Sequence, residues 1–296
     1  MTIRVQNLTH VYNRGLAYET KAIDDVSFTI EDGELIGIVG HTGSGKSTLI
    51  QHLNGILKPD SGSIFIGDTE ITAKGAKLYE LRKRVGLVFQ YPEYQLFEET
   101  VSLDVSFGPK NLGLSQEEIA VRVREAIELV NLDFADIENR SPFELSGGQK
   151  RRVAIAGVIA MRPDILILDE PTAGLDPKAH ADILNMIESI REQTGCTIIL
   201  VSHNMGDIAA MSTRVFVMDS GRLTKTGTPA EIFADNGYLH SIGLGLPPAA
   251  EVLEMVREQL ESVKPPDAVP ANVPASGCVL TEADLVKFVA GEAARS

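Results

Sequence analysis

The feature that most constrains the fold is a glycine-rich segment that follows a short apolar run. Residues 35–39 read LIGIV, and residues 40–48 read GHTGSGKST. The apolar run predicts a strand buried on both faces, and residues 46–56 are expected to form a helix. The glycine-rich segment fits the pattern G-x-x-x-x-G-K-[ST], whose fixed positions are Gly40, Gly45, Lys46 and Ser47. Strand, loop and helix in this order are the context that a phosphate-binding loop needs.

The chemistry explains this spacing. Glycines let successive backbone N–H groups turn inward around an anion, and the helix that follows adds the positive end of its dipole. We expect Lys46 to reach the β- and γ-phosphates and the Ser47 hydroxyl to ligate Mg²⁺. A chance glycine-rich turn would not need the Lys-Ser pair. The predicted ATP-binding residues are Gly40, His41, Thr42, Gly43, Ser44, Gly45, Lys46, Ser47 and Thr48.

A second apolar run ends in two carboxylates. Residues 165–168 read ILIL, and Asp169 and Glu170 follow. A strand with only apolar residues must lie in the interior of the sheet. Its carboxyl end then places the two carboxylates at the sheet edge where open α/β sheets bind ligands. Asp169 fits the acid that holds Mg²⁺. Glu170 fits a general base for the attacking water, the alternative being a helix N-terminal charge because Pro171 comes next.

The order of the predicted elements gives the fold class and the domains. Strands alternate with helices, which indicates an α/β fold with a mainly parallel core sheet. The stretch from about 91 to 163 is mostly helical and is expected to form a separate lobe. After residue 245 the composition changes: a helix, a proline-rich linker at 264–277 and a last helix that opens with a capping box. We therefore expect one large domain over 1–245 and an extension over 246–296 with a dimer-stabilising or regulatory role, the alternative being a solvated tail with one docked helix.

Composition excludes several classes of protein. The net charge of −14 and a pI near 4.9 disfavour nucleic-acid binding, which needs basic surfaces. No secretory signal is visible at the N-terminus. The longest apolar run, residues 153–161, is about half of the ~20 residues that a membrane span requires. Cys196 and Cys278 match no metal-ligand spacing, so reduced thiols are expected.

Residues 145–152, LSGGQKRR, resemble the signature of ABC ATPases. The other motifs of that family occur in the family's order between residues 40 and 203, and the resemblance covers about 1–240. It implies a P-loop NTPase core with a mainly parallel sheet, an antiparallel β subdomain, a helical subdomain and a small C-terminal helical extension. The further motifs are Gln90, the pair Asp169-Glu170, AGLD at 173–176 and His203 in VSHN.

The resemblance also implies residue roles. The signature would bind, in trans, the γ-phosphate held by a partner ATPase, which agrees with a Ser-Gly-Gly helix start being an anion site. Gln90 would sense Mg²⁺ and water, His203 would hold the γ-phosphate and the water, and Asp176 would communicate across the dimer. Tyr12 would stack on adenine, with Tyr18 as a rival because a longer loop that contains Tyr18 follows Tyr12. The signature residues are Ser146, Gly147, Gly148 and Gln149.

Three kinds of ABC ATPase compete: a transporter motor, a soluble ATPase of translation or DNA repair, and a regulator without turnover. One nucleotide domain and an intact Glu170 and His203 favour the transporter. Several strings resemble the ATPases of energy-coupling factor (ECF) vitamin importers, second-paralogue type; the alternative is a cobalt/nickel-type or binding-protein-dependent importer. The resemblance implies a peripheral protein on the cytoplasmic face of the cell membrane, with a second ATPase, a transmembrane coupling subunit and a membrane substrate-binding subunit as partners.

The stretch after Gln90 is rich in rings and acids. Residues 90–101 read QYPEYQLFEETV in a chain with only 10 Phe and 6 Tyr. We expect Tyr94, Phe97 and Glu98 to contact a helix of the membrane subunit, because rings can grip a helix and carboxylates can pair with its basic residues. The alternative is that the rings pack the core of the helical lobe.

Overall fold

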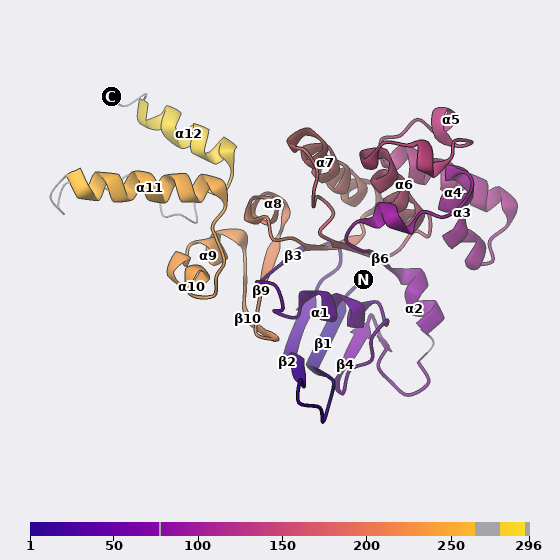
Figure 1. Ribbon diagram of the computed structural model, residues 1–296, viewed down its shortest axis with the longest axis horizontal. Helices are drawn as coiled ribbons and strands as arrows, with labels where there is room; N and C mark the ends of the chain where they lie inside the picture. The colour runs from indigo at the N-terminus through magenta and orange to yellow at the C-terminus, as the bar shows by residue number, and fades with distance from the viewer. Residues whose placement is uncertain (77, 264–278, 294–296) are drawn as a thin grey trace. The chain divides into compact units, whose positions relative to one another are not determined.

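The computed structural model describes residues 1–76, 78–263 and 279–293 (Figure 1). These residues divide into two compact units. The first comprises residues 1–34 and 47–201, and the second comprises residues 35–46 and the described residues from 202 onward. The expected proline-rich linker at 264–277 and Cys278 lie outside the described residues. The predicted domain boundary at 245 remains a prediction.

The first unit begins with an antiparallel sheet in the strand order β2-β1-β4-β5. Its first strand pairs on both sides, Ile3 lying opposite Ile30 of one neighbour and Ile66 of the other. Buried residues alternate with exposed ones along the start of this strand, which is the pattern of a sheet with one covered face. The strands are β1 (Ile3–Tyr12), β2 (Thr20–Ile30), β4 (Ser61–Ile66) and β5 (Thr69–Glu70).

Three parallel strands form the centre of the first unit: β6 (Val85–Val88), β7 (Ile165–Asp169) and β8 (Thr197–Val201). Val88 lies opposite Leu168, and Leu168 opposite Leu200. Nearly every residue of these strands is buried, as continuous apolar runs require. Because the strands are in register, the residues that follow Val88 and Leu168 leave the sheet at the same edge.

Helices occupy the intervals between these strands. In the lobe, α3, α4 and α6 pack on one another around aliphatic side chains such as Val105, Ile127 and Ile155. The Ser115 hydroxyl accepts from the Glu118 N–H and caps α4, as its Ser-x-x-Glu start predicts. The elements are α1 (Lys46–Leu53), α2 (Leu78–Arg84), η1 (Pro92–Gln95), α3 (Val101–Asn111), α4 (Gln116–Leu129), α5 (Phe134–Ile137), η2 (Pro142–Glu144), α6 (Gly147–Ile159) and α7 (Pro177–Thr194).

The second unit contains the strand that precedes the glycine-rich loop. This strand, β3 (Leu35–Val39), is fully buried and pairs in parallel with β9 (Arg214–Asp219). A hairpin then joins β9 to β10 (Arg222–Gly227), as the sequence Asp-Ser-Gly predicts. Ser220 and Gly221 in its turn both have positive φ, which a tight hairpin requires. The helices are α8 (Met205–Met211), α9 (Pro229–Phe233), α10 (Asn236–Ser241), α11 (Pro248–Val263) and α12 (Glu282–Ala293).

The last two helices pack on each other, α11 in orange and α12 in yellow in Figure 1. The Thr281 hydroxyl accepts from the Asp284 N–H and the Asp284 carboxylate accepts from the Thr281 N–H, so the predicted capping box is confirmed. Their shared core consists of Ala249, Leu253 and Val279 with Leu285 and Phe288 against them. Within the described residues, every helix is too short or too polar to span a membrane.

Candidate functional site

The glycine-rich loop has the backbone of an anion cradle. Gly40, Gly43 and Gly45 have φ of 155°, 84° and 103°, conformations that residues with a side chain rarely adopt. A Cβ on Gly40 would lie 2.3 Å from the Met218 carbonyl oxygen, whereas one on Gly43 would meet no atom within 4 Å. The loop is therefore packed on one side and open on the other, which leaves room for a phosphate group.

Two polar side chains of the loop are held in place by it. The Lys46 ammonium donates to the carbonyls of Gly40 and His41, at 2.6 and 3.0 Å, and so lies across the loop. The Ser44 hydroxyl is fully buried and makes no hydrogen bond to any described residue. A cation across the loop and an unsatisfied hydroxyl within it both suit an anionic ligand with several oxygens.

The β9–β10 turn braces the loop from outside. The Gly221 N–H donates to the Ser44 carbonyl at 3.1 Å. One ring nitrogen of His41 lies 2.8 Å from the Thr42 carbonyl and the other 2.9 Å from an Asp219 carboxylate oxygen. The Thr42 carbonyl and then Asp219 raise the pKa of His41 above its ordinary value. Sequence reasoning placed His41 in the loop but missed Asp219, which lies far away along the chain.

Tyr12, at the end of β1, lies beside the helix that follows the loop. Its hydroxyl is 3.4 Å from the Thr48 hydroxyl, and its ring is 37% exposed. Tyr18 lies in the turn after β1 and is 66% exposed. Tyr12 is thus the ring held against α1, which favours it over Tyr18 as the residue that stacks on a base.

The predicted metal and base residues follow two adjacent parallel strands. Gln90 comes two residues after β6, and Asp169 is the last residue of β7. Because β6 and β7 are in register, both side chains emerge at one sheet edge. Hydroxyl, amide and carboxylate oxygens are the hard donors that Mg²⁺ prefers, so Ser47, Gln90 and Asp169 fit that ion chemically.

Glu170 begins a sharp turn after β7. Its φ is 51°, in the left-handed region that side-chain-bearing residues seldom occupy. Its N–H donates to the Val201 carbonyl on the next strand at 2.9 Å, which holds this backbone in place. Such conformations persist only where the surroundings enforce them and gather at functional sites. At Glu170 the backbone therefore turns out of the path that β7 would follow if the strand continued.

The signature begins a helix with an open N-terminus. Ser146 and Gln149 form a reciprocal capping box at the start of α6. Added Cβ atoms on Gly147 and Gly148 would meet nothing within 4 Å, so the backbone here is accessible to a ligand or a partner. This is the local geometry that an anion site at a helix start needs.

A buried arginine joins this helix to two loops that the sequence analysis treated separately. The Arg151 side chain is 3% exposed and forms a bidentate ion pair with Glu93, at 2.9 and 3.1 Å. It also donates to the carbonyls of Pro171 and Ala173, at 3.1 and 2.8 Å. Burial is the strongest single influence and raises the pKa of Glu93, but the Arg151 hydrogen bonds, the Glu93 backbone N–H and the Arg151 charge together hold the pKa below its ordinary value.

The remaining predicted residues lie at helix starts or turns. Asp176 caps α7 by accepting from the N–H groups of Lys178 and Ala179, a structural role that the sequence analysis did not anticipate. His203 is exposed in the turn between β8 and α8. Their proposed parts in dimer communication and γ-phosphate binding remain predictions.

The rings after Gln90 lie mostly at the surface. Tyr94 is 84% exposed and Phe97 57% exposed. Phe97 contacts Phe107 edge to face at 5.0 Å between ring centroids. The backbone is fixed by Asp104, whose carboxylate accepts from the N–H groups of Phe97 and Glu98 at 2.9 Å. The rings therefore form an exposed cluster rather than the core of the lobe.

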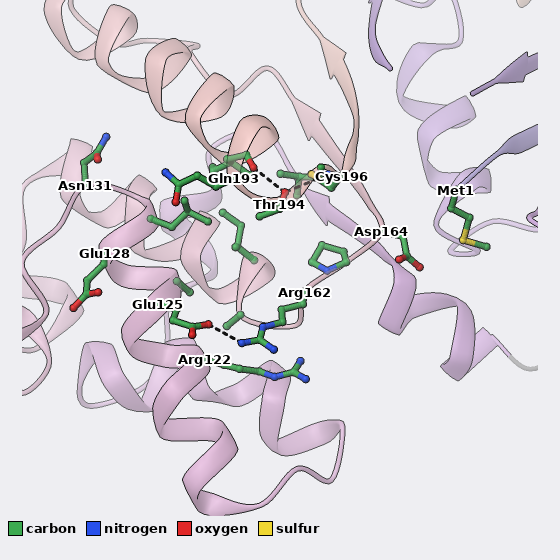
Figure 2. A pocket seen from close by; sticks show the side chains of 18 of the residues that line it. Met1, Arg122, Glu125, Glu128, Asn131, Arg162, Asp164, Gln193, Thr194 and Cys196 are labelled. Atoms are coloured by element: carbon green, nitrogen blue, oxygen red, sulfur yellow. Dashed lines mark hydrogen bonds and ion pairs between the residues drawn. The ribbon is translucent and has the colours of Figure 1, made fainter. Parts of the chain in front are cut away.

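A cavity of about 800 Å³ lies at the other end of the parallel strands, where Asp164 and Cys196 precede β7 and β8 (Figure 2). Arg162 points to Glu125, and the two form an ion pair at 2.7 Å. Burial raises the pKa of the Cys196 thiol above its ordinary value, which disfavours the reactive thiolate form. The cavity is separate from the carboxylates at the opposite ends of the strands.

Comparison with known families assigns the chain. Residues 23–173 match the family model described as ABC transporter. The chain belongs to the ABC transporter family.

Relatives within the ABC transporter family are more specific. The chain is 56% identical over 259 residues to the "Energy-coupling factor transporter ATP-binding protein EcfA2" of Clostridium tetani (strain Massachusetts / E88), a match that covers 88% of this chain and 90% of the relative. It thus belongs with the ECF transporter ATP-binding proteins.

Solved ABC structures confirm the fold class. One is cbiO1 from Clostridium perfringens, described as part of the ABC transporter complex cbiONQ. It is 39% identical to this chain, the match covers 85% of this chain and 98% of that chain, and the TM-score is 0.73. Another is an ATP-binding cassette whose dimeric, post-hydrolysis structure holds ADP and Pi. It is 28% identical to this chain, the match covers 76% of this chain and 98% of that chain, and the TM-score is 0.67.

Proposed function

We propose that this chain binds and hydrolyses ATP as the motor subunit of an ECF-type ABC importer. The observation that carries the proposal is the 56% identity to an ECF transporter ATP-binding protein over 88% of the chain. The open glycine cradle with Lys46 across it supports the ATP-binding part. The cobalt/nickel-type alternative has support in the likeness to cbiO1, but at 39% identity.

The phosphate loop would bind the nucleotide. Backbone N–H groups between Gly40 and Gly45 donate to the β- and γ-phosphate oxygens, and the Lys46 ammonium neutralises their charge. Tyr12 stacks on the adenine ring. These groups orient the substrate and exclude alternative poses, which is most of what phosphoryl transfer requires of a protein.

Glu170 would act on the attacking water. The water oxygen forms a bond to the γ-phosphorus while the bond from that phosphorus to the β–γ bridging oxygen breaks, and the Glu170 carboxylate accepts the proton that the water loses. His203 would hold the γ-phosphate and the water in line. Mg²⁺, which Ser47, Gln90 and Asp169 would hold, supplies charge neutralisation for the phosphate oxygens.

The signature would complete a second chain's site. Ser146, Gly147, Gly148 and Gln149 would contact the γ-phosphate held by a partner ATPase, and Asp176 would link the two sites. The accessible start of α6 supports this proposal. Closing and opening of the ATPase pair would then move the membrane subunits.

The assembly would place the protein at the cytoplasmic face of the cell membrane. Its partners would be a second ABC ATPase, a transmembrane coupling subunit and a membrane substrate-binding subunit for a vitamin or related micronutrient. The exposed ring cluster with Tyr94, Phe97 and Glu98 supports a protein contact at this surface. An affinity-tagged chain should therefore co-purify from membranes with these subunits.

Substitution of Glu170 tests the catalytic part. In the co-purified complex, Glu170→Gln should bind ATP normally, while steady-state hydrolysis falls about 10²–10⁴-fold because the amide cannot accept the proton. Phosphate release and nucleotide binding are the measurements. Near-normal turnover in the variant complex would remove Glu170 from the role of base.

A further inference from the structure

Three rings form a column that runs from β1 into α1. The ring centroids of Tyr12 and His10 are 4.6 Å apart, and those of His10 and His52 are 4.7 Å apart. Both contacts are edge to face, with interplanar angles of 78° and 70°. Exposure falls along the column, from 37% at Tyr12 to 1% at His52. A partly exposed ring is thus supported from behind by two imidazoles.

The inner imidazole is held by the helix itself. His52 Nδ1 lies 2.7 Å from the Thr48 carbonyl oxygen, so this nitrogen carries the proton and donates. The Nε2 atom is buried and makes no hydrogen bond within the described part of the chain. A buried polar atom without a hydrogen bond lowers stability and calls for an explanation. The explanation that we pursue is that the position of the His52 ring serves function, because this ring supports His10 and, through it, Tyr12.

Thr48 connects the column to the loop. Its carbonyl accepts from His52, and its hydroxyl lies 3.4 Å from that of Tyr12. It belongs to the first turn of α1, directly after the predicted phosphate and metal residues Lys46 and Ser47. His10 is fixed independently, with Nδ1 3.2 Å from the Lys58 carbonyl. The end of β1 and the start of α1 are therefore joined by the ring contacts and by the contact between the Tyr12 and Thr48 hydroxyls.

We propose that His10 and His52 are positioning residues that hold the Tyr12 ring in register with the first turn of α1 and thereby set the affinity for the nucleotide base. The inference rests on the proposed function, in which Tyr12 stacks on adenine. A ring that is already oriented loses less conformational freedom when a base binds, so more of the stacking energy appears as affinity. Edge-to-face contacts fix such orientations.

The charged groups around the column make it sensitive to acid. Burial, the strongest influence, lowers the pKa of His52, and the neighbouring His10 acts in the same direction. The Thr48 and Lys58 carbonyls and Asp60 oppose them but do not prevail, and Asp60 is itself paired with Arg14 at 3.3 Å. His52 is thus neutral in the folded protein at neutral pH.

Because the folded pKa lies below the unfolded one, the contribution of His52 to stability is present above the ordinary histidine pKa, about 6.5, and is lost as the pH falls below it. A proton on His52 would place a charge in a buried position beside His10. We therefore expect base affinity in the wild-type chain to stay constant above the ordinary histidine pKa and to weaken only as the pH falls below about 6.5, and His52→Asn to flatten this dependence.

The test compares ATP with inorganic tripolyphosphate, which lacks a base, using the full chain and EDTA to prevent hydrolysis. The variants are His52→Asn, whose amide nitrogen can replace Nδ1 without the ring, and His10→Ala. Each should weaken ATP binding about two- to tenfold, the range for one aromatic contact, and leave tripolyphosphate binding unchanged. Tyr18→Ala is the matched control and should bind both probes normally.

Two results would overturn the inference. Unchanged ATP affinity in both histidine variants, with Tyr12→Ala weakened, would show that Tyr12 needs no support. An equal loss for ATP and tripolyphosphate would show that the column only shapes the loop. Unchanged ATP affinity in Tyr12→Ala would instead refute the base-stacking part of the proposed function, on which the inference depends. Circular dichroism of each variant, with His52→Leu as a second substitution, separates these results from unfolding.

Discussion

At the residue scale, Arg151 is the side chain with the most demanding surroundings. A buried guanidinium is tolerated only when its hydrogen bonds are satisfied, and Arg151 finds Glu93 and the carbonyls of Pro171 and Ala173. These partners lie after Gln90 and after Glu170. One cation therefore fixes the relative positions of the signature helix and of the two loops that follow the predicted metal and base residues.

Arg151→Ala should lower the free energy of unfolding by about 3–5 kcal/mol, because it leaves the partly buried Glu93 carboxylate and the Pro171 and Ala173 carbonyls without their partner. Arg151→Lys keeps the charge but loses the bidentate geometry, so the stability of this variant should lie between that of the wild-type chain and that of Arg151→Ala. Arg151→Lys should still fold. Its kcat should fall at least about tenfold, while its Kd for ATP should change little because the substitution leaves the residues of the phosphate loop unchanged. Chemical denaturation and steady-state ATPase assays measure both effects.

Arg152→Ala is the matched control. Its guanidinium lies next along the same helix but pairs with Asp182 at 3.3 Å as a partly exposed ion pair, so the change should cost no more than about 1 kcal/mol. If Arg151→Lys had normal kcat, or if Arg152→Ala were as damaging, the special role of Arg151 would be contradicted.

At the element scale, the segment from η1 to α3 carries the exposed ring cluster on a rigid frame. Tyr91 has a φ of 55°, Asp104 holds the backbone of Phe97 and Glu98, and Thr100 caps α3. Exposed rings on an ordered backbone are typical of protein contacts, because little freedom is lost when a partner binds. The same segment contains Glu93, which ties it to the signature helix through Arg151.

Glu98→Arg should uncouple transport from hydrolysis. The reversed charge would repel the basic residues that we expect on the partner helix, so uptake should fall at least about tenfold while basal ATPase of the isolated chain is retained. Uptake into proteoliposomes and ATPase activity are the two measurements. Glu128→Arg, a similar reversal on α4, is the control and should transport normally. Unimpaired uptake in Glu98→Arg would place the contact elsewhere.

At the scale of the whole molecule, the second unit ends in a pair of helices, and one of them exposes apolar side chains to solvent. α11 and α12 share a small core, but Val252, Met255 and Val256 of α11 are 40%, 56% and 44% exposed. Their spacing places them on one helix face. An apolar face of this kind agrees with the expected dimer-stabilising or regulatory role, the alternative being a solvated tail.

Truncation at residue 245 should weaken ATP-dependent association of two ATPase chains, measured by analytical ultracentrifugation in the Glu170→Gln background. Met255→Glu should reproduce most of this loss without deletion, because it charges the exposed apolar face. Lys287→Glu, on the neighbouring helix, is a charge control and should associate normally. Equal association of the truncated and full chains would favour the solvated tail.

Much of the fold and the site follows from local sequence. Continuous apolar runs such as LIGIV and ILIL are buried strands, the glycine pattern from Gly40 to Gly45 has the predicted unusual backbone, and Ser115 and Thr281 cap their helices. Each depends on interactions within one or two turns of chain, so residue identity and spacing suffice. The catalytic and ligand roles of these residues remain predictions that the proposed experiments test.

Only the tertiary structure revealed the groups that hold the site in place. Arg151 and Glu93 are 58 residues apart, His41 and Asp219 are 178 apart, and Tyr12 and Thr48 are 36 apart. Nothing in the spacing of these residues pairs them, because which side chains meet depends on how strands and helices pack. The sequence alone determined the elements and the chemistry that each carries. Packing decided which distant residues support that chemistry, since contacts of long sequence separation form only in the folded chain.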